Sequence, residues 1–256
     1  MSSINMRLWL SSWLLLMFFG GSLITSNAAP SSFSFEDNFD IMWAEDHFKT
    51  SDDGQVWHLS LDKETGCGFQ TKQRYRFGWF SMKLKLVSGD SAGVVTAYYM
   101  CSDLDAAPKR DELDFEFLGN RTGEPYTIQT NVYKSGVESR SEYTKTTADQ
   151  TTSSPTKNPC TCSLATRGGL EKTDWKKAPF VSSYKDFNAD ACQWKDPYPA
   201  CVSTTTENWW DQYDAWNLSD SQEEDFSWVE RNLVIYDYCK DTERFPTLPE
   251  ECALRA

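Results

Sequence analysis

Alternation of apolar and polar residues is the main pattern in the first half of the chain, and it predicts β-strands. In residues 82–86 apolar side chains alternate with lysines, which is the period of a strand with one buried face. Residues 93–100 are rich in β-branched and aromatic side chains, and residues 126–133 alternate again. Turn sequences with glycine separate these runs at 88–90 and 122–125. Regularly spaced strands with few helical patterns predict an all-β antiparallel sandwich or barrel.

A single helix is predicted near the C-terminus, from Ser221 to about Arg231. Ser221 followed by Glu224 fits a capping box at its start. An apolar stripe at helical spacing follows, made of Phe226, Val229 and Leu233.

The N-terminus predicts a secretory signal peptide over residues 1–29. Arg7 precedes an apolar run from Leu8 to Ile24, and small residues follow at 26–29. The alternative is a signal anchor that stays in the membrane. Paired serines and glycines interrupt the run and no stop-transfer flank follows, so cleavage is favoured.

Composition excludes several classes of function. The 256 residues include 25 Lys and Arg against 38 Asp and Glu, giving a net charge of −13. This acid excess argues against nucleic-acid binding, which needs clustered basic residues. Two histidines without a His-x-x-x-His pairing argue against a catalytic zinc site, and no metal is expected. A mean hydropathy of −0.58 describes a soluble protein without membrane association after signal cleavage.

Eight cysteines gain meaning in a secreted chain, because oxidising compartments permit disulfides. Short separations in the C-terminal part favour local pairing of Cys192 with Cys201 and of Cys239 with Cys252. Two isolated cysteines are expected to be buried free thiols, Cys67 and Cys101. Two sequons fit a secreted glycoprotein, and Asn120 is the stronger because it ends a strand in a predicted turn.

Residues 111–119 hold the most informative pattern in the chain. Alternation places apolar residues on one strand face and three acids on the other: Leu113, Phe115 and Phe117 against Glu112, Asp114 and Glu116. Three carboxylates in a row repel one another, which opposes folding and suggests that they have a function. A solvated acidic strand or a calcium site is the alternative, although a calcium loop would show its acids in a turn.

Paired carboxylates on one surface are the machinery of glycoside cleavage. The Cα atoms of Glu112 and Glu116 are expected about 13 Å apart, at a rise of ~3.3 Å per residue. A retaining mechanism needs their carboxyl groups about 5–5.5 Å apart, so both side chains must lean over Asp114. We therefore predict Glu112 and Glu116 as the working pair, with Asp114 tuning their charge.

The stretch Asp-Glu-Leu-Asp-Phe-Glu-Phe-Leu-Gly-Asn resembles the active-site strand of plant xyloglucan endotransglucosylase/hydrolases, which belong to glycoside hydrolase family 16. Further matches lie at residues 39–43, 91–98, 129–133, 165–169, 172–175 and 238–252. The resemblance implies a concanavalin-like jelly roll over residues 30–191 and a C-terminal extension over 192–256 that contains disulfides. It implies Glu112 as nucleophile, Asp114 as helper and Glu116 as general acid/base. It also implies sugar contacts at Gln129, Thr130, Asn131, Gly169 and Arg244.

The same resemblance implies a secreted, apoplastic cell-wall glycoprotein that cleaves and religates, or hydrolyses, the β-1,4-glucan backbone of xyloglucan. The partner is xyloglucan or a related β-glucan, the protein is a monomer, and no cofactor is needed. Trp175 is expected either to stack on a sugar or to pack in the interior. The alternatives are a β-glucanase of another specificity and a catalytically impaired glycan-binding variant.

Residues 137–164 depart from the family pattern. Family members continue after residue 133 with an Asn-Arg-Glu motif, several strands and a Trp-Asn-Ala-Asp-Asp-Trp motif, all absent here. The replacement is rich in Ser and Thr and resembles a disordered linker. Reading its possible codons in a shifted frame permits a family-like sequence, so we hypothesise an out-of-frame segment flanked by deletions. The expected result is a sandwich that lacks strands, is destabilised and has little activity.

Overall fold

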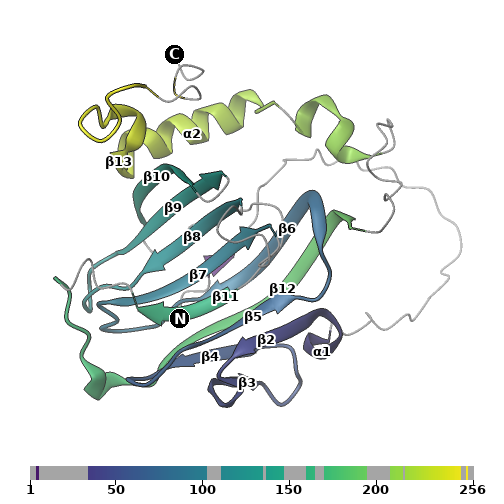
Figure 1. Cartoon of the computed structure of the whole chain (residues 1–256), viewed down its shortest axis with the longest axis vertical. Coiled ribbons are helices and arrows are strands. Elements are labelled where there is room, and N and C mark those ends of the chain that lie inside the picture. Colours follow the sequence, from purple (N-terminus) through teal and green to yellow (C-terminus); the bar gives the residue numbers. More distant parts are fainter. Residues whose placement is uncertain are drawn as a thin grey trace, which may run out of the picture.

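The computed structural model describes residues 4–5, 34–102, 111–134, 137–146, 160–164, 170–194, 208–215, 217–248 and 252. Within these residues, the strands form one eight-stranded and one five-stranded sheet, packed face to face (Figure 1). This arrangement confirms the predicted all-β sandwich of the jelly-roll class. All strand pairs are antiparallel.

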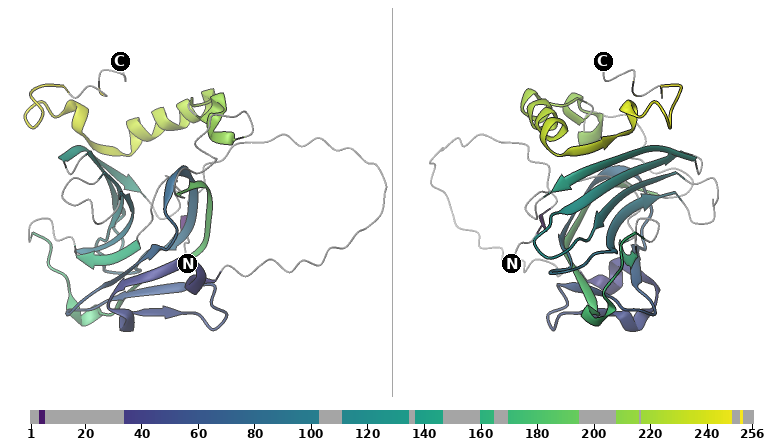
Figure 2. Two further views of the ribbon diagram at one scale, coloured as in Figure 1. Left: turned by 45° about the vertical axis from the view of Figure 1, so that its right-hand side comes forward. Right: turned by 90° about the vertical axis from the view of Figure 1, so that its left-hand side faces the viewer.

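The eight-stranded sheet carries the acidic strand near its middle and is curved (Figure 2). Its strands, in spatial order, are β13 (Val234–Asp237), β10 (Val137–Thr146), β9 (Tyr126–Lys134), β8 (Glu112–Leu118), β7 (Val94–Cys101), β11 (Cys160–Leu164), β5 (Cys67–Thr71) and β2 (Phe39–Trp43). The strands predicted around residues 93–100, 111–119 and 126–133 are thus β7, β8 and β9, three neighbours in space.

The five-stranded sheet covers the other side of the core. Its order is β1 (Ile4–Asn5), β6 (Tyr75–Lys85), β12 (Phe180–Gln193), β4 (Trp57–Leu61) and β3 (Phe48–Thr50). The alternating run at 82–86 lies at the end of β6, as predicted. Most of the predicted signal peptide lies outside the described residues. Removing it takes only the two-residue strand β1 from this sheet.

Aromatic side chains fill the space between the sheets. Phe35, Phe39 and Trp57 pack edge-on against Phe69, with ring centroids 5.3, 5.1 and 5.8 Å away. The largest fully buried side chains come from both sheets: Trp57, Tyr98, Tyr184, Phe39, Phe69, Phe80 and Phe117. Edge-to-face ring pairs contribute about 0.5–1.5 kcal/mol each beyond the burial of their area, so this cluster anchors both sheets.

Short helices lie at the two ends of the sandwich (Figure 1). Helix α1 (Phe35–Asn38) precedes β2, and η1 (Glu45–His47) and η3 (Trp175–Lys177) lie in loops. The C-terminal part holds η5 (Trp209–Asp211), η6 (Tyr213–Ala215), α2 (Asp220–Asn232) and η7 (Tyr238–Lys240).

Helix α2 is the predicted C-terminal helix, but its cap differs from the prediction. The capping box consists of Ser219 and Gln222, so the helix begins at Asp220 and not at a cap on Ser221. Both Ser219 and Ser221 could have been the cap. Only Ser219 is followed three residues later by a glutamine, Gln222, whose Oε1 accepts from the Ser219 N–H at 2.8 Å. The predicted apolar stripe is not buried, since Phe226 is 44% exposed.

Residues 137–146 and 160–164 form strands where a polar linker was expected, while the absence of the family's own strands stays a prediction. Residues 137–146 form β10 between β9 and β13, and residues 160–164 form β11 between β7 and β5. The backbone groups of neighbouring strands pair whatever the side chains are, so a polar segment can complete a sheet whose edges are open. The eight-stranded sheet is therefore continuous from β13 to β2.

The cysteine predictions divide into confirmed and open ones. Cys239 and Cys252 form a disulfide, and Cys67 and Cys101 are buried free thiols, as predicted. Cys192 is disulfide-bonded, while its predicted partner Cys201 lies outside the described residues.

Among the helices of the described ranges, none is long and apolar enough to cross a membrane.

Candidate active site

The three acids of β8 share the face that points away from the core. Phe117 on the same strand is fully buried in the core and Phe115 packs against it. Successive side chains of a strand alternate between faces, so Glu112, Asp114 and Glu116 lie together on the opposite side, as predicted.

Register with the neighbouring strands defines the surroundings of each acid. Asn131 of β9 lies opposite Asp114 and Gln129 lies opposite Glu116. Tyr133, also on β9, lies opposite Glu112. On the other side, β7 places a cysteine, a tyrosine and an alanine opposite the acids in that order: Cys101, Tyr99 and Ala97.

One amide links two of the carboxylates. The Nδ2 atom of Asn131 lies 3.3 Å from Oδ2 of Asp114 and 3.5 Å from Oε2 of Glu116. Gln129 donates from Nε2 to Oδ1 of Asn131 at 2.9 Å, which fixes the direction of that amide. Asn131 is 3% exposed, so its donors are aimed at the acids and not at water. Both predicted sugar-contacting residues thus also support the acids.

Asp114 is held in its protonated form over much of the pH scale. Burial, the charge of Glu112 and a hydrogen bond with Glu112 together raise the pKa of Asp114 to about 8, against a smaller opposing effect of Asn131. The hydrogen bond between Asp114 and Glu112 then has Asp114 as its donor. A protonated aspartic acid beside a glutamate keeps that glutamate available as an ionised nucleophile.

Glu116 is also disposed to keep a proton. Burial raises the pKa of Glu116, and the charge of Glu112 adds to the effect, whereas the hydrogen bond from Asn131 opposes it. A carboxyl group that remains protonated in weakly acidic solution can serve as a general acid. The β8 face therefore has Glu112 at one end and the proton-holding Glu116 at the other.

The other residues implied by the resemblance are spread over the molecule. Thr130 lies opposite Phe115, which places it on the core side of the sheet, away from the acids. Arg244 follows η7 in the C-terminal part, next to β13, which is separated from β8 by β10 and β9. Gly169 lies outside the described residues. Trp175 packs against the core, with its ring 6.1 Å from that of Phe180, so packing is the alternative found.

Two neighbours of the acids were not predicted from the sequence. Tyr99 and Ala97 flank Asp114 and Glu116 because residues 93–100 form a strand beside β8. Apolar and aromatic residues occur on both faces of that run, so alternation gave no signal for its site-facing side.

The predicted glycosylation residue lies where the sequence placed it. Asn120 follows the end of β8, and residues 121–124 form an exposed turn. Its Nδ2 donates to the carbonyl of Pro125 at 3.0 Å, which ties the turn to the start of β9.

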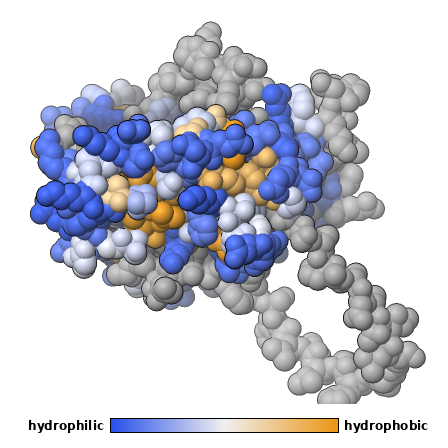
Figure 3. All heavy atoms as spheres, turned by 90° about the horizontal axis from the view of Figure 1, so that it is seen from below, coloured by the Kyte–Doolittle hydropathy of each residue, from blue (hydrophilic) through white to orange (hydrophobic). Residues whose placement is uncertain are grey.

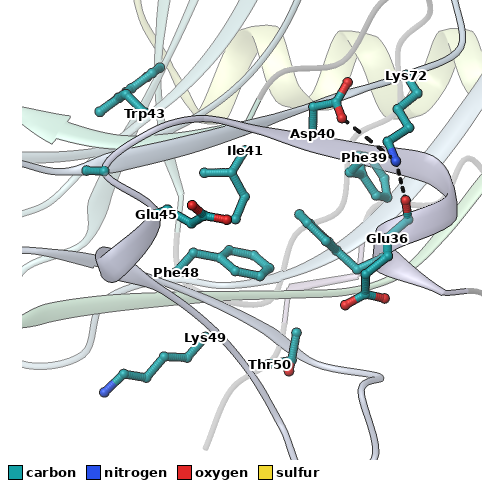
Figure 4. A pocket seen from close by; sticks show the side chains of 12 residues that line it. Glu36, Phe39, Asp40, Ile41, Trp43, Glu45, Phe48, Lys49, Thr50 and Lys72 are labelled. Carbon is teal, nitrogen blue, oxygen red and sulfur yellow. Dashed lines mark hydrogen bonds and ion pairs between the residues drawn. The ribbon is translucent and has the colours of Figure 1, made fainter.

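A hollow of about 990 Å³ lies elsewhere, at the open side of the sandwich. It is lined by residues of α1, β2, η1 and β3, with Phe48 and Ile41 pointing into it and Lys72 contacting Asp40 and the Glu36 carbonyl (Figure 4). Seen from below, apolar surface gathers among hydrophilic side chains (Figure 3). β2 and β3 are the outermost strands of their sheets, so this hollow is the gap between two edges and is not the acid site.

The fold and the acidic strand define a protein of the glycoside hydrolase class. Residues 35–156 match the family described as "Glycosyl hydrolases family 16", and residues 204–252 match "Xyloglucan endo-transglycosylase (XET) C-terminus". The first match contains the whole of β8 and β9, and the second contains α2 and β13.

Full-length comparison defines the family more narrowly. The chain is 60% identical to "Probable xyloglucan endotransglucosylase/hydrolase protein 8" of Arabidopsis thaliana, covering 90% of each chain. It is 38% identical to "Xyloglucan endotransglucosylase protein 34" of Populus tremula x Populus tremuloides, over 93% of this chain and 94% of the other. The chain belongs to the xyloglucan endotransglucosylase/hydrolase family.

The comparisons also bear on the length of the chain. The alignment with the Arabidopsis relative spans 274 residues, more than the 256 of this chain, so that relative has residues without a counterpart here. Among solved structures, a β-1,3-1,4-glucanase (lichenase) from a mouse hindgut metagenome is 12% identical with a TM-score of 0.45, covering 62% of this chain and 94% of that one.

Proposed function

We propose that this protein cleaves the β-1,4-glucan backbone of xyloglucan with retention of configuration. The Glu112 carboxylate attacks the anomeric carbon, and the bond from that carbon to the leaving oxygen breaks. Glu116 gives its proton to the leaving oxygen, and a covalent glycosyl ester remains on Glu112. Asp114 donates its hydrogen bond to Glu112 before the attack and orients the nucleophile.

The second half reverses these roles. A hydroxyl group of another sugar chain, or water, gives its proton to the Glu116 carboxylate and attacks the anomeric carbon. The ester bond breaks and Glu112 leaves as a carboxylate. Transfer to a sugar is religation of the backbone, and transfer to water is hydrolysis.

The observation that carries this proposal is the linked set of acids on β8. Asn131 lies within hydrogen-bond distance of Asp114 and Glu116, and Glu112 hydrogen-bonds Asp114, so the set joins both ends of the strand face. Because the relatives are described as xyloglucan endotransglucosylases or hydrolases, we propose xyloglucan over other β-glucans as the substrate.

Two matched substitutions separate the roles of the glutamates. With an aryl glycoside of a xyloglucan oligosaccharide, whose leaving group needs no proton, we expect Glu116→Gln to retain most first-step activity. Glu112→Gln should lose at least ~10³-fold on the same substrate, because no other group forms the ester. Equal loss in both variants contradicts the assignment. Mixed-linkage glucan serves as the comparison substrate, and faster cleavage of it than of xyloglucan supports the alternative of another β-glucanase.

We propose further that the protein acts as a monomer in the cell wall or apoplast, with a glycan on Asn120. The Cys239–Cys252 disulfide supports passage through an oxidising compartment, where such bonds persist. Secretion from plant cells, followed by mass spectrometry of the N-terminus and of the peptide with Asn120, tests cleavage after residue 29 and glycosylation together.

Whether this chain is active remains a separate prediction. Its acids are in place on β8, but β10 next to the site strands has a mostly polar sequence. We expect weak activity, or sugar binding without turnover, and recovery when the residues present in the Arabidopsis relative are restored. Full activity in the chain as it stands would overturn this expectation without affecting the assigned roles.

A further inference from the structure

Lysines gather on the outer face of the five-stranded sheet. Leu84 of β6 is buried in the core, so its neighbours Lys83 and Lys85 lie on the opposite face of that strand. Tyr184 of β12 is buried in the same way, which places Lys185 on this outer face too. Lys83 and Lys185 are direct partners in the register of the two strands. Like charges opposite each other destabilise a sheet, so this placement suggests that the lysines have a function.

Lys49 extends the basic surface to the edge strand β3, because its neighbour Phe48 packs against the core. A row of register partners crosses four strands from this lysine: Lys49, His58, Ser183 and Lys85. His58 and Ser183 hydrogen-bond at 2.9 Å, so the row is joined between the two lysines at its ends. Neighbouring strands lie about 4.8 Å apart, which puts the Cα atoms of the end lysines roughly 14 Å from each other. We call four side chains the lysine face: Lys49, Lys83, Lys85 and Lys185.

Two carboxylates offset part of this charge. Asp186 follows Lys185 where the register of β12 with β6 shifts, and its Oδ2 lies 2.5 Å from Nζ of Lys83. Asp53, in the loop before β4, interacts electrostatically with Lys185. It is held mainly by Ser51, whose hydroxyl donates to it at 2.6 Å. Lys83 is therefore the lysine whose charge is largely neutralised.

The other three lysines of the face have no ion pair among the described residues. All three side chains, Lys49, Lys85 and Lys185, are exposed. Asp190 also lies on the outer side of β12, but roughly 16 Å along the strand from Lys185. The lysine face is therefore positive in a chain whose net charge is −13. A polyanion is attracted to this face and repelled by the acidic remainder of the surface.

We propose that the lysine face binds an anionic polysaccharide, a chain that carries carboxylate groups at intervals along its sugar backbone. The lysine ammonium is a compact charge with three donors, which suits single carboxylates better than the planar bidentate contacts that arginine prefers. Each exposed lysine–carboxylate pair contributes little by itself, so binding depends on a polymer that reaches several lysines at once. Strand pairing fixes the spacing of the Cα atoms from which these lysines extend.

The lysine face and the acids of β8 lie on opposite sides of the molecule. The two sheets pack face to face, so the outer face of the five-stranded sheet points away from the outer face of the eight-stranded sheet (Figure 1). The protein can therefore hold an anionic polymer on one side while a neutral glucan chain occupies the other. Binding to the lysine face needs none of the β8 acids, so it is independent of the proposed cleavage reaction.

An anionic membrane is the other surface that a basic face could meet. Proteins that lie on membranes insert aromatic or leucine side chains into the lipid. The row from Lys49 to Lys85 has no such side chain, since His58 and Ser183 stand between the two lysines. We therefore favour the polysaccharide, and lipid vesicles enter the experiment as the contrary outcome.

Binding to polygalacturonate tests the proposal. The full chain is secreted from a eukaryotic host, and its affinity for the polymer is measured at low and at high salt. We expect binding at about 20 mM NaCl and at least ~10-fold weaker binding at about 200 mM, because the Debye length falls from roughly 20 Å to about 7 Å. Fully methyl-esterified polygalacturonate has the same backbone without the charge and should not bind. Failure to bind polygalacturonate at low salt, equal binding of the esterified polymer, or tighter binding to phosphatidylserine vesicles would overturn the proposal.

Matched double substitutions locate the binding surface. Lys85→Gln combined with Lys185→Gln should weaken binding by about 10-fold, roughly 3-fold for each lysine removed. Arg231→Gln combined with Lys240→Gln removes the same charge from the C-terminal part, and we expect it to change binding by less than about 2-fold. Both pairs should keep the Tm of the unsubstituted chain, because all four side chains are exposed. Equal weakening in the two pairs would show that net charge carries the binding, and it would reject the lysine face as the site.

Discussion

Asn131 and Asp114 face each other across β9 and β8, with Nδ2 of the amide 3.3 Å from Oδ2 of the acid. The same amide lies 3.5 Å from Glu116. Its hydrogen bonds lower the pKa of both acids, in opposition to burial. Asn131 therefore sets how strongly these two acids hold their protons.

Replacing this amide should move the pH dependence of activity upward. In Asn131→Leu the pKa of Glu116 rises further, so its acid form persists to higher pH. The alkaline limb of the kcat/KM profile, which reports the general acid of the free enzyme, should shift to higher pH, with a loss of about 10- to 100-fold at the optimum.

The control is Gln129→Leu, which removes only the bond that orients the Asn131 amide. We expect a smaller change in the same direction. The measurement is kcat/KM on a xyloglucan oligosaccharide between pH 4 and 9. An alkaline limb that stays in place, or moves down, contradicts the role given to Asn131.

Asp114 should make the fold less stable as the pH rises. Its pKa is raised from 3.8 to about 8 in the folded chain, so between these values the folded state binds the extra proton. Stability then falls with increasing pH across this window. Asp114→Asn cannot ionise, so its Tm should match the unsubstituted protein near pH 4 and exceed it near pH 8, by roughly 3 °C or more. Glu124→Gln, in an exposed turn, should show no such trend.

The alternation of residues 111–119 predicted the site face from sequence, because a strand with one buried face leaves its acids on the other. Spacing likewise predicted the Cys239–Cys252 disulfide. The resemblance implied a sugar contact at Thr130, but it marks positions along the chain and does not say which face of the sheet a residue lies on. The register places Thr130 on the core side of β9. Tyr99 and Ala97 were missed because a strand that is apolar on both faces shows no period.

Residues 137–164 show a different limit of sequence reasoning. Their composition predicts a linker, yet β10 and β11 occupy places in the eight-stranded sheet. Strand formation there depends on open neighbouring edges, which no local pattern reveals. The identity of the α2 cap was also beyond sequence, because Ser219 and Ser221 both fit the pattern and only the structure shows which serine accepts from an N3 backbone N–H.

Strand β10 should be the least protected part of the large sheet. Its sequence over residues 137–146 is mostly polar, with Val137 and Tyr143 as the exceptions, and its register with β9 shifts between Glu138 and Arg140. Strands without an apolar face specify their register weakly and contribute little to burial. Hydrogen exchange should therefore be faster by about 10-fold or more in β10 than in β8. Equal protection of the two strands would show that backbone pairing alone stabilises β10.

His47 should stabilise the protein in acid. Its Nε2 lies 3.0 Å from Asp62 and its Nδ1 lies 3.2 Å from Asp46. Hydrogen bonds with Asp62 and Asp46 raise the pKa of His47 above 6.5. The stabilisation is complete below pH 6.5 and is lost as the pH rises through the raised value. His47→Gln should lower Tm more at pH 5 than at pH 9, whereas His58→Gln serves as the comparison. A larger loss at pH 9 would contradict this ion pair.

Gly119 at the end of β8 should not tolerate a side chain. A Cβ atom there would overlap the carbonyl oxygen of Ser91. The backbone of Ser91 is held in place, because its N–H donates to the carbonyl of Asn120 and its carbonyl accepts from the N–H of Val94. Because the obstacle is backbone, relief requires β8 to shift at the strand end that precedes the Asn120 turn. Gly119→Ala should therefore cost about 1–3 kcal/mol and lower Tm by several degrees. Gly89→Asn is the matched control, since that site has a positive φ but nothing within 4 Å, and asparagine adopts such backbone with little strain. A Tm loss in Gly89→Asn as large as in Gly119→Ala would show that backbone conformation, and not the contact with Ser91, requires glycine in these loops.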